Sequence, residues 1–242
     1  MRIALIGYGK LGKAIEQVAL RSAHHLSFCI ASENADDIHR IDLDNTDVVI
    51  EATHPELAEE HIRLITGKKL PIVVATTGWY ESLGELQAHV EEHHTALIYG
   101  SNFSIGVNIL FKINRMLATL MNRYPHYDVF IDDRHHRHKA DAPSGTAMRL
   151  VYDTLQHLDR KDEYVLNDQL QHRPPESNEL CVSSIRAGEI IGEHRVVYTS
   201  AVDQIEIYHR AFSREGFALG AVIAAEWIVG KVGVFEFSEV LG

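Results

Sequence analysis

The chain opens with an apolar run that passes directly into a glycine loop, and this junction constrains the fold more than any other feature. Residues 3–6 (IALI) have the composition of a buried strand, and residues 7–12 (GYGKLG) follow at once. A helix-compatible segment comes next. Strand, G-x-G-x-x-G loop and helix in this order are typical of a dinucleotide-binding βαβ unit, because the glycines allow a tight turn and bring a diphosphate to the helix N-terminus.

The rest of the first hundred residues repeats this alternation of short apolar runs and amphipathic segments. The expected strands are residues 3–6, 26–31, 48–52, 72–75 and 96–99. Such alternation predicts an α/β fold of parallel βαβ units, with a sheet that helices cover on both faces. The carboxyl ends of parallel strands meet at one crevice, and we therefore expect further ligands of a dinucleotide at those ends.

Three segments complete the predicted nucleotide site. Glu33, about twenty positions beyond the loop, would bind the adenosine ribose. Residues 75–78 (ATTG) and 100–103 (GSNF) follow later strands and would line the nicotinamide half. The absence of an arginine between Glu33 and Arg40 favours NAD, whereas Ser32 could tolerate a 2′-phosphate, so NADH and NADPH both stay open as the cofactor. The predicted cofactor-binding residues are Gly7, Tyr8, Gly9, Lys10, Leu11, Gly12, Glu33, Ala75, Thr76, Thr77, Gly100, Ser101, Asn102 and Phe103.

The pattern changes after the first hundred residues. We expect a helix over about 105–121, a strand from about 127, and a second helix that begins at Ser144. The polar stretch 159–178, with two adjacent prolines, indicates an exposed loop. Strand-like runs follow at 180–186, 195–199 and 204–209. A final apolar helix, about 217–229, resembles the sheet-covering helices of the first half, and we expect it to return to the first domain.

The densest group of polar side chains lies at residues 135–147, which read HHRHKADAPSGTA. Pro143 keeps the residue before it out of the helical region, and Ser144 is a preferred N-cap for the helix that follows. The N–H groups of Gly145 and Thr146 then lie in the first turn, at the positive end of the helix dipole, where an oxyanion finds donors. This stretch is therefore expected to bind a substrate that carries carboxylates.

Composition excludes several classes of protein. The formal net charge is −11 and no basic run is present, which argues against nucleic acid as a partner. No apolar stretch is long enough for a signal peptide or a membrane span, so we expect a cytoplasmic protein without a membrane partner. The two cysteines, Cys29 and Cys181, lie in strand-like runs without a partner at metal or redox spacing, which indicates reduced thiols.

Four motifs together resemble one known family. HHRHKADAPSGTA, ATTG, SNFSIGVN (101–108) and IRAGEIIGEH (185–194) are similar to the dihydrodipicolinate reductase family, also called 4-hydroxy-tetrahydrodipicolinate reductases, and the likeness runs the whole length of the chain. The resemblance implies a Rossmann dinucleotide-binding domain over 1–103 and 213–242, completed by the C-terminal helix. It also implies a central α+β substrate-binding and oligomerisation domain over 104–212, with a mixed sheet.

The resemblance further implies a function. Family members reduce 4-hydroxy-tetrahydrodipicolinate to tetrahydrodipicolinate with NADH or NADPH, in the diaminopimelate route to lysine, and assemble as homotetramers. By motif position, His135 is the implied general acid/base and Lys139 the second catalytic cation. The implied residues for the dicarboxylate substrate are His136, Ser144, Gly145 and Thr146. Asp133 and Arg134 stand where the family usually has Glu-Ala, which leaves the chemistry alone but adds a charge whose partner the sequence does not identify.

The implied chemistry suits these residue types. Reduction of a conjugated cyclic imine leaves negative charge that a nearby acid must neutralise, and an imidazole titrates near neutral pH. The ammonium of Lys139 would hold a carboxylate. Because adjacent strand residues face opposite sides, His135 and His136 serve one ligand only if the strand ends or bends there, and we expect that it does.

Other functions stay open. His135, His136 and His138 are close enough in sequence to suggest a zinc site. Adjacent histidines on a strand point in opposite directions, however, and no metal site is expected. A non-catalytic dinucleotide sensor is a second alternative, and another NAD(P)-dependent imine reductase of similar build is a third. Arg214, near the second domain junction, could reach either cofactor or substrate.

Overall fold

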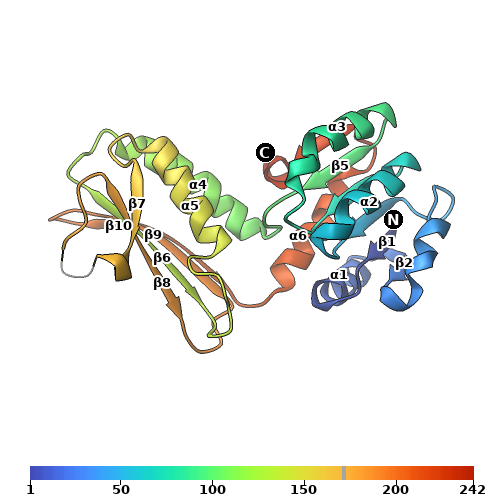
Figure 1. The fold of residues 1–242 in the computed structure, drawn as a ribbon, viewed down its shortest axis with the longest axis horizontal. Coiled ribbons are helices and arrows are strands. Elements are labelled where there is room, and N and C mark those ends of the chain that lie inside the picture. The colour runs from blue at the N-terminus through green and yellow to red at the C-terminus, as the bar shows by residue number, and fades with distance from the viewer. Residues whose placement is uncertain (171–172) are drawn as a thin grey trace. The chain divides into compact units, whose positions relative to one another are not determined.

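The computed structural model describes residues 1–170 and 173–242, and the chain divides into two compact units (Figure 1). Unit 1 comprises Met1–Ile105 and Arg214–Gly242, and unit 2 comprises Gly106–Ser213. These bounds lie close to the domain bounds expected from the sequence. Which ligand each unit binds stays a prediction.

A six-stranded parallel sheet forms the centre of unit 1, with the order β11-β5-β4-β3-β1-β2. Its strands are β1 (Arg2–Ile6), β2 (His25–Ile30), β3 (Val48–Glu51), β4 (Ile72–Val74), β5 (Ala96–Tyr99) and β11 (Gly233–Glu236). Five of these lie at the expected runs, which confirms the parallel βαβ organisation. The sequence pattern missed β11, because this edge strand has four residues, all of them only half-buried.

Helices cover both faces of this sheet. They are α1 (Lys10–Arg21), α2 (Pro55–Gly67), α3 (Leu83–Glu92) and α6 (Glu215–Ile228), with short helical turns η1 (Ser32–Arg40), η2 (Tyr80–Ser82) and η4 (Phe237–Leu241). Alternate residues of β1 enter different cores: Leu5 packs with α1 and α6, whereas Ile6 packs with α2 and α3. The final helix therefore belongs to the first unit, as expected.

Unit 2 is a mixed five-stranded sheet with the order β10-β9-β6-β8-β7. Its strands are β6 (Asp128–His135), β7 (Glu163–Leu166), β8 (Glu179–Arg186), β9 (Gly192–Thr199) and β10 (Gln204–Ala211). Strands β6, β8 and β7 are parallel, and β9 is antiparallel to both β6 and β10. Helices α4 (Ile105–Met121) and α5 (Gly145–His157) lie against one face (Figure 1). The expected α+β unit with a mixed sheet is confirmed.

The expectation of an exposed loop over 159–178 was wrong in part. Strand β7 and the helical turn η3 (Asn167–Gln169) form within it, while residues 171–172 lie outside the described residues. Strand β7 pairs with β8 at the edge of the sheet and buries only Val165, so its sequence shows no strand-like alternation. Within the described part of the chain, no helix is both long and apolar enough to cross a bilayer.

Candidate active site

The glycine loop connects β1 to α1, and two of its glycines are required by the backbone. Gly7 has φ +98°, in the left-handed region, and a Cβ there would lie 2.2 Å from the carbonyl oxygen of Ala52. A Cβ at Gly12 would lie 2.1 Å from the carbonyl oxygen of Gly7. At Gly9, by contrast, a Cβ would meet no described atom within 4 Å, so this stretch of backbone is open to a ligand.

Two cavities of unit 1 contain most of the predicted cofactor residues. The larger, about 760 Å³, is lined by the glycine loop and by the segments that follow β2, β3 and β4, with Glu33, Ala75 and Thr76 among its walls. The smaller, about 240 Å³, is lined by residues 100–103 and by Arg214. Both include Lys10, Leu11 and Ala75 in their walls. Of the predicted set, Gly12 packs beneath the loop and Thr77 is exposed.

These walls fit a dinucleotide. The first residues of α1 include Lys10 and Lys13 and no acidic side chain, and the N-cap Gly9 offers no side chain to occupy the free N–H groups. An anion therefore finds backbone donors and positive charge at this helix start. Glu33 lies in the first turn of η1, directly after β2, where its carboxylate can accept from ribose hydroxyls.

The second group of predicted residues lies where β6 ends and α5 begins. Strand β6 ends at His135, as expected, and the loop 136–143 leads to Ser144, whose hydroxyl accepts from the N–H of Ala147 over 3.1 Å. The prediction that Ser144 is the N-cap is confirmed. Ser144 is only 2% exposed, so any effect of this residue on a ligand would come through the helix start that it fixes. Gly145 is exposed, and a Cβ there would contact none of the described atoms within 4 Å.

The buried face of strand β6 carries apolar residues in its first half and polar residues in its second half. Val129, Ile131, Asp133 and His135 alternate on the side that packs against the helices, and all four are buried. Asp133 is 0% exposed, so its charge requires partners inside the protein. The alternation alone would have placed this carboxylate in the core, and this signal was available in the sequence.

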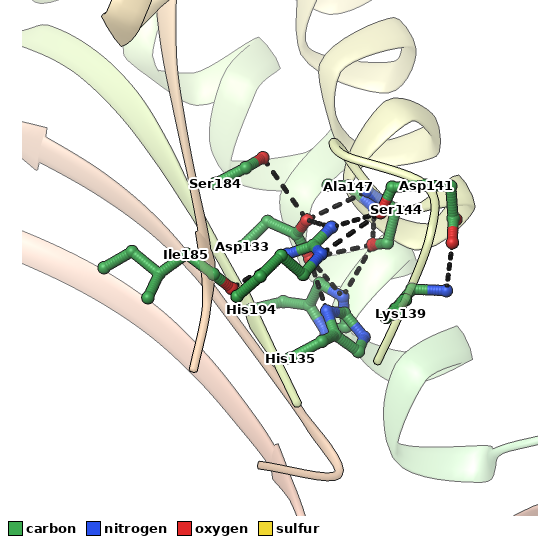
Figure 2. A network of polar contacts seen from close by, with 10 residues as sticks. Asp133, His135, Lys139, Asp141, Ser144, Ala147, Ser184, Ile185 and His194 are labelled. Carbon is green, nitrogen blue, oxygen red and sulfur yellow. Dashed lines mark hydrogen bonds and ion pairs between the residues drawn. The ribbon is translucent and has the colours of Figure 1, made fainter. Parts of the chain in front are cut away.

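The partners of Asp133 come from three other elements (Figure 2). Arg186 of β8 donates from Nη2 to Oδ2 over 2.8 Å, and Ser144 donates from its backbone N–H to Oδ2 over 2.9 Å and from its hydroxyl to Oδ1 over 2.8 Å. Oδ1 also lies 3.0 Å from Nδ1 of His135 and 3.4 Å from Nε2 of His194 on β9. Arg186 and His194 were not among the predicted site residues.

The charge on Asp133 is strongly stabilised. Burial by itself raises the pKa of this carboxyl, but the contacts with His135, His194, Arg186 and Ser144 outweigh burial and hold the pKa well below its usual range. Asp133 is thus a carboxylate at neutral pH and only accepts hydrogen bonds. Through it, the imidazole of His135 and the first turn of α5 share one anchor.

Lys139 lies in the loop between β6 and α5 and pairs with Asp141, with 2.7 Å between Nζ and Oδ1 (Figure 2). The ammonium holds the pKa of the Asp141 carboxyl below its usual value. Arg186 donates to the backbone carbonyl of Asp141 over 2.6 Å, which ties this loop to the same arginine that neutralises Asp133. The predicted cation is therefore beside the site, within an ion pair of its own loop.

The histidines that lie together in the structure are not the three that the zinc alternative requires. Among the described residues, His135 shares a group of possible metal ligands with Asp133 and His194, whose ligand atoms lie within 4.8 Å of one another, and not with its sequence neighbours. Both oxygens of Asp133 already accept from Ser144, and a guanidinium lies against one of them. A cation at this point would be repelled by Arg186, so the arrangement favours proton chemistry over metal binding.

Comparison with known proteins gives consistent matches. Family models described as the N-terminus and the C-terminus of dihydrodipicolinate reductase match residues 1–103 and 106–241. The chain is 37% identical to the 4-hydroxy-tetrahydrodipicolinate reductase of Christiangramia forsetii, over 100% of this chain and 98% of that protein. It is 36% identical to the protein of the same name from Neisseria meningitidis serogroup C, over 86% of this chain and 77% of that protein.

A solved structure shares the fold along the whole chain. The dihydrodipicolinate reductase from Paenisporosarcina sp. TG-14, described as dipicolinate-bound, superposes with a TM-score of 0.79. The match covers 99% of this chain and 98% of that chain at 20% sequence identity. At this identity the match supports the architecture of both units rather than any ligand.

Proposed function

The chain belongs to the dihydrodipicolinate reductase family, and on this premise we propose that it reduces 4-hydroxy-tetrahydrodipicolinate to tetrahydrodipicolinate with a nicotinamide dinucleotide. It is an oxidoreductase of the diaminopimelate route to lysine. The observation that carries the proposal is the geometry of the motif at 135–147. There, one buried carboxylate contacts a histidine at the end of β6 and holds the N-cap residue of α5.

Unit 1 is the proposed dinucleotide-binding unit. The bound nicotinamide supplies a hydride to the substrate. The free N–H groups at the start of α1 would hold the diphosphate, and Gly7 and Gly9 keep the backbone close to it. Glu33 would accept from a ribose 2′-hydroxyl, which favours NADH, while Lys13 in the same cavity leaves NADPH usable.

Unit 2 is the proposed substrate-binding unit. The backbone N–H groups of Gly145 and Thr146 at the start of α5 would receive one substrate carboxylate, with His136 and Lys139 as further cationic or donor groups. For Lys139, this requires the ammonium to share its charge between Asp141 and the substrate. His135, which is 8% exposed, would supply the proton that reduction of the conjugated ring requires.

We also propose a homotetramer that works in the cytoplasm. Unit 2 carries exposed apolar side chains on β10, at the edge of its sheet, where Ile205 and Tyr208 are each 42% exposed. Exposed apolar side chains on an edge strand favour pairing with a second copy. Light scattering of the purified protein, together with an Ile205→Lys variant, tests this assembly, and a monomeric wild type would contradict it.

The activity is tested with the imine that forms from pyruvate and aspartate semialdehyde. Oxidation of NADH or NADPH that depends on this compound supports the proposed reaction. A dinucleotide sensor would bind NADH without turnover, and a different imine reductase would oxidise NADH only with another cyclic imine. Either of these results would overturn the proposal.

A further inference from the structure

One buried carboxylate determines which nitrogen of each neighbouring imidazole carries a hydrogen. Asp133 is ionised and only accepts, and Nδ1 of His135 makes an ion-pair contact with Oδ1 at 3.0 Å, without the alignment of a hydrogen bond. A bare nitrogen lone pair at this distance would be repelled by the carboxylate, so the contact favours a hydrogen on Nδ1. The nitrogen of His135 that can give or take a proton is therefore Nε2. This assignment follows from the identity of the partner and from the distance between the two atoms.

The same reasoning fixes His194. The Ser144 hydroxyl has one hydrogen, which it donates to Oδ1 of Asp133, so its oxygen can only accept from other partners. Nε2 of His194 lies 3.2 Å from that oxygen and must be the donor. His194 thus presents an N–H toward both Ser144 and Asp133, from a β9 position that lies directly opposite Asp133 in the β6–β9 register.

The buried Gly192 lies close against Nε2 of His135. This glycine begins β9, and a Cβ at its position would lie 3.1 Å from Nε2 of His135. Any larger side chain would therefore crowd the nitrogen that exchanges the proton. The backbone of β9 thus contributes to the site by lacking a side chain at this point.

Asp133 also fixes the anion-binding helix start. Ser144, bound to the carboxylate through both its N–H and its hydroxyl, is the N-cap of α5, and the exposed Gly145 follows it. Arg186 neutralises the carboxylate and, through the carbonyl of Asp141, holds the loop between β6 and α5. The carboxylate consequently contacts His135 at the end of the strand and the N-cap of the helix directly, and it is linked to the loop through Arg186.

We propose that Asp133 is the positioning residue of this site: it holds His135 in the tautomer that presents Nε2, at a fixed place relative to the N-terminus of α5. This inference deepens the proposed function and rests on it, because the tautomer matters for catalysis only if His135 donates the proton in the proposed reaction. Asp133 itself is too deeply buried to touch a substrate, so it acts through His135 and Ser144.

The first test compares Asp133→Asn with Asp133→Glu and with Asp132→Asn as the matched control. Asp132 precedes Asp133 on the opposite face of β6 and pairs with Arg134, so its substitution makes the same chemical change outside the network. We expect Asp133→Asn to lower kcat about 10²–10⁴-fold, because the amide does not fix the tautomer or stabilise a protonated imidazole. The Kd for NADH, whose proposed site lies in unit 1, stays unchanged. Asp133→Glu keeps an acceptor and retains more kcat than Asp133→Asn.

The second test determines the tautomer of His135 in the absence of substrate. In ¹⁵N-histidine spectra of the wild-type protein without ligands, assigned with His135→Gln and His194→Gln, neutral His135 should carry its hydrogen on Nδ1 and neutral His194 on Nε2. Asp133→Asn should shift the His135 signals toward mixed tautomers, whereas Asp132→Asn should not. Hydrogen on Nε2 of neutral wild-type His135 overturns the proposal, even if the Asp133 variants fail to fold.

The two proposals fail in different ways. A wild-type protein with the expected tautomers that does not reduce 4-hydroxy-tetrahydrodipicolinate contradicts the function and, with it, the catalytic meaning of the tautomer. An active wild-type protein whose Asp133→Asn variant keeps full kcat contradicts the positioning role alone. Binding of dipicolinate, a planar dicarboxylate, measured by calorimetry, reports separately on the helix start, and we expect it to weaken in Asp133→Asn.

Discussion

Replacement of Ser144 by alanine removes three hydrogen bonds that hold the strands and the helix of the substrate site together. The buried hydroxyl accepts from the N–H of Ala147 and from Nε2 of His194, and it donates to Oδ1 of Asp133. Loss of an N-cap costs about 1 kcal/mol, and loss of a hydrogen bond to a charged group costs about 1.5–3 kcal/mol. Because the three bonds share one oxygen atom, their energies do not simply add, and we expect a destabilisation of about 2–4 kcal/mol.

The assay is urea and thermal unfolding of wild-type protein and of Ser144→Ala, with Ser82→Ala as the control. Ser82 is the N-cap residue of α3 but makes no side-chain capping bond, and its hydroxyl donates over 2.6 Å to the exposed carboxylate of Glu59. Its substitution therefore removes a hydroxyl at a helix start, and a solvent-screened bond to a carboxylate, without loss of a cap or of a buried charged bond. The thermal midpoint of Ser144→Ala should fall by about 5–15 °C for a chain of this size. A loss of stability no larger than that of Ser82→Ala would refute the role assigned to the Ser144 hydroxyl.

Three further outcomes follow from the structure. Gly192→Ala should lower kcat about tenfold or more by crowding Nε2 of His135, without changing the Kd for NADH, and a variant with wild-type kcat would contradict that contact. Glu33→Ala should weaken NADH binding about tenfold relative to NADPH, since a charged hydrogen bond to the 2′-hydroxyl is lost, and an unaltered ratio of the two Kd values would argue against its ribose role. Arg173 lowers the pKa of Glu179 to about 2, so the folded form favours the ionised carboxylate. The stability that this ion pair contributes is fully present above the unfolded pKa of 4.5 and is lost as the pH falls toward 2. Between these pH values, the free energy of unfolding measured in urea should fall less steeply for Glu179→Gln than for wild type. An identical pH dependence of the two proteins would contradict the role of this ion pair.

Local signals in the sequence predicted the parts of the fold that depend on local physics. The strand-to-glycine-loop junction at 3–12 needs only a buried run and a backbone without side chains, and the structure has both. The start of α5 needs only a proline, a capping serine and an apolar stripe, and Ser144 caps the helix as expected. In both cases, the residues that determine the structure are adjacent in the chain.

The parts that were missed depend on contacts between distant segments. Asp133 binds Arg186 and His194, which lie on β8 and β9 and reach it only because those strands flank β6. Register between strands so far apart cannot be predicted from one sequence, although the alternation of β6 already indicated that Asp133 is buried. Strands β7 and β11 were missed for another reason: each has four residues at a sheet edge, where neither length nor alternation gives a signal.

The most direct measurement compares wild-type protein and His135→Gln in the reduction of 4-hydroxy-tetrahydrodipicolinate, with kcat, KM and NADH affinity determined for both. Wild type should oxidise NADH or NADPH only when the substrate is present, and His135→Gln should lose about 10²–10⁴-fold in kcat with little change in KM or in NADH affinity. A His135→Gln variant with wild-type kcat, or a wild-type protein that binds NADH and leaves the substrate unreduced, would contradict the assignment of the proton donor or of the reaction.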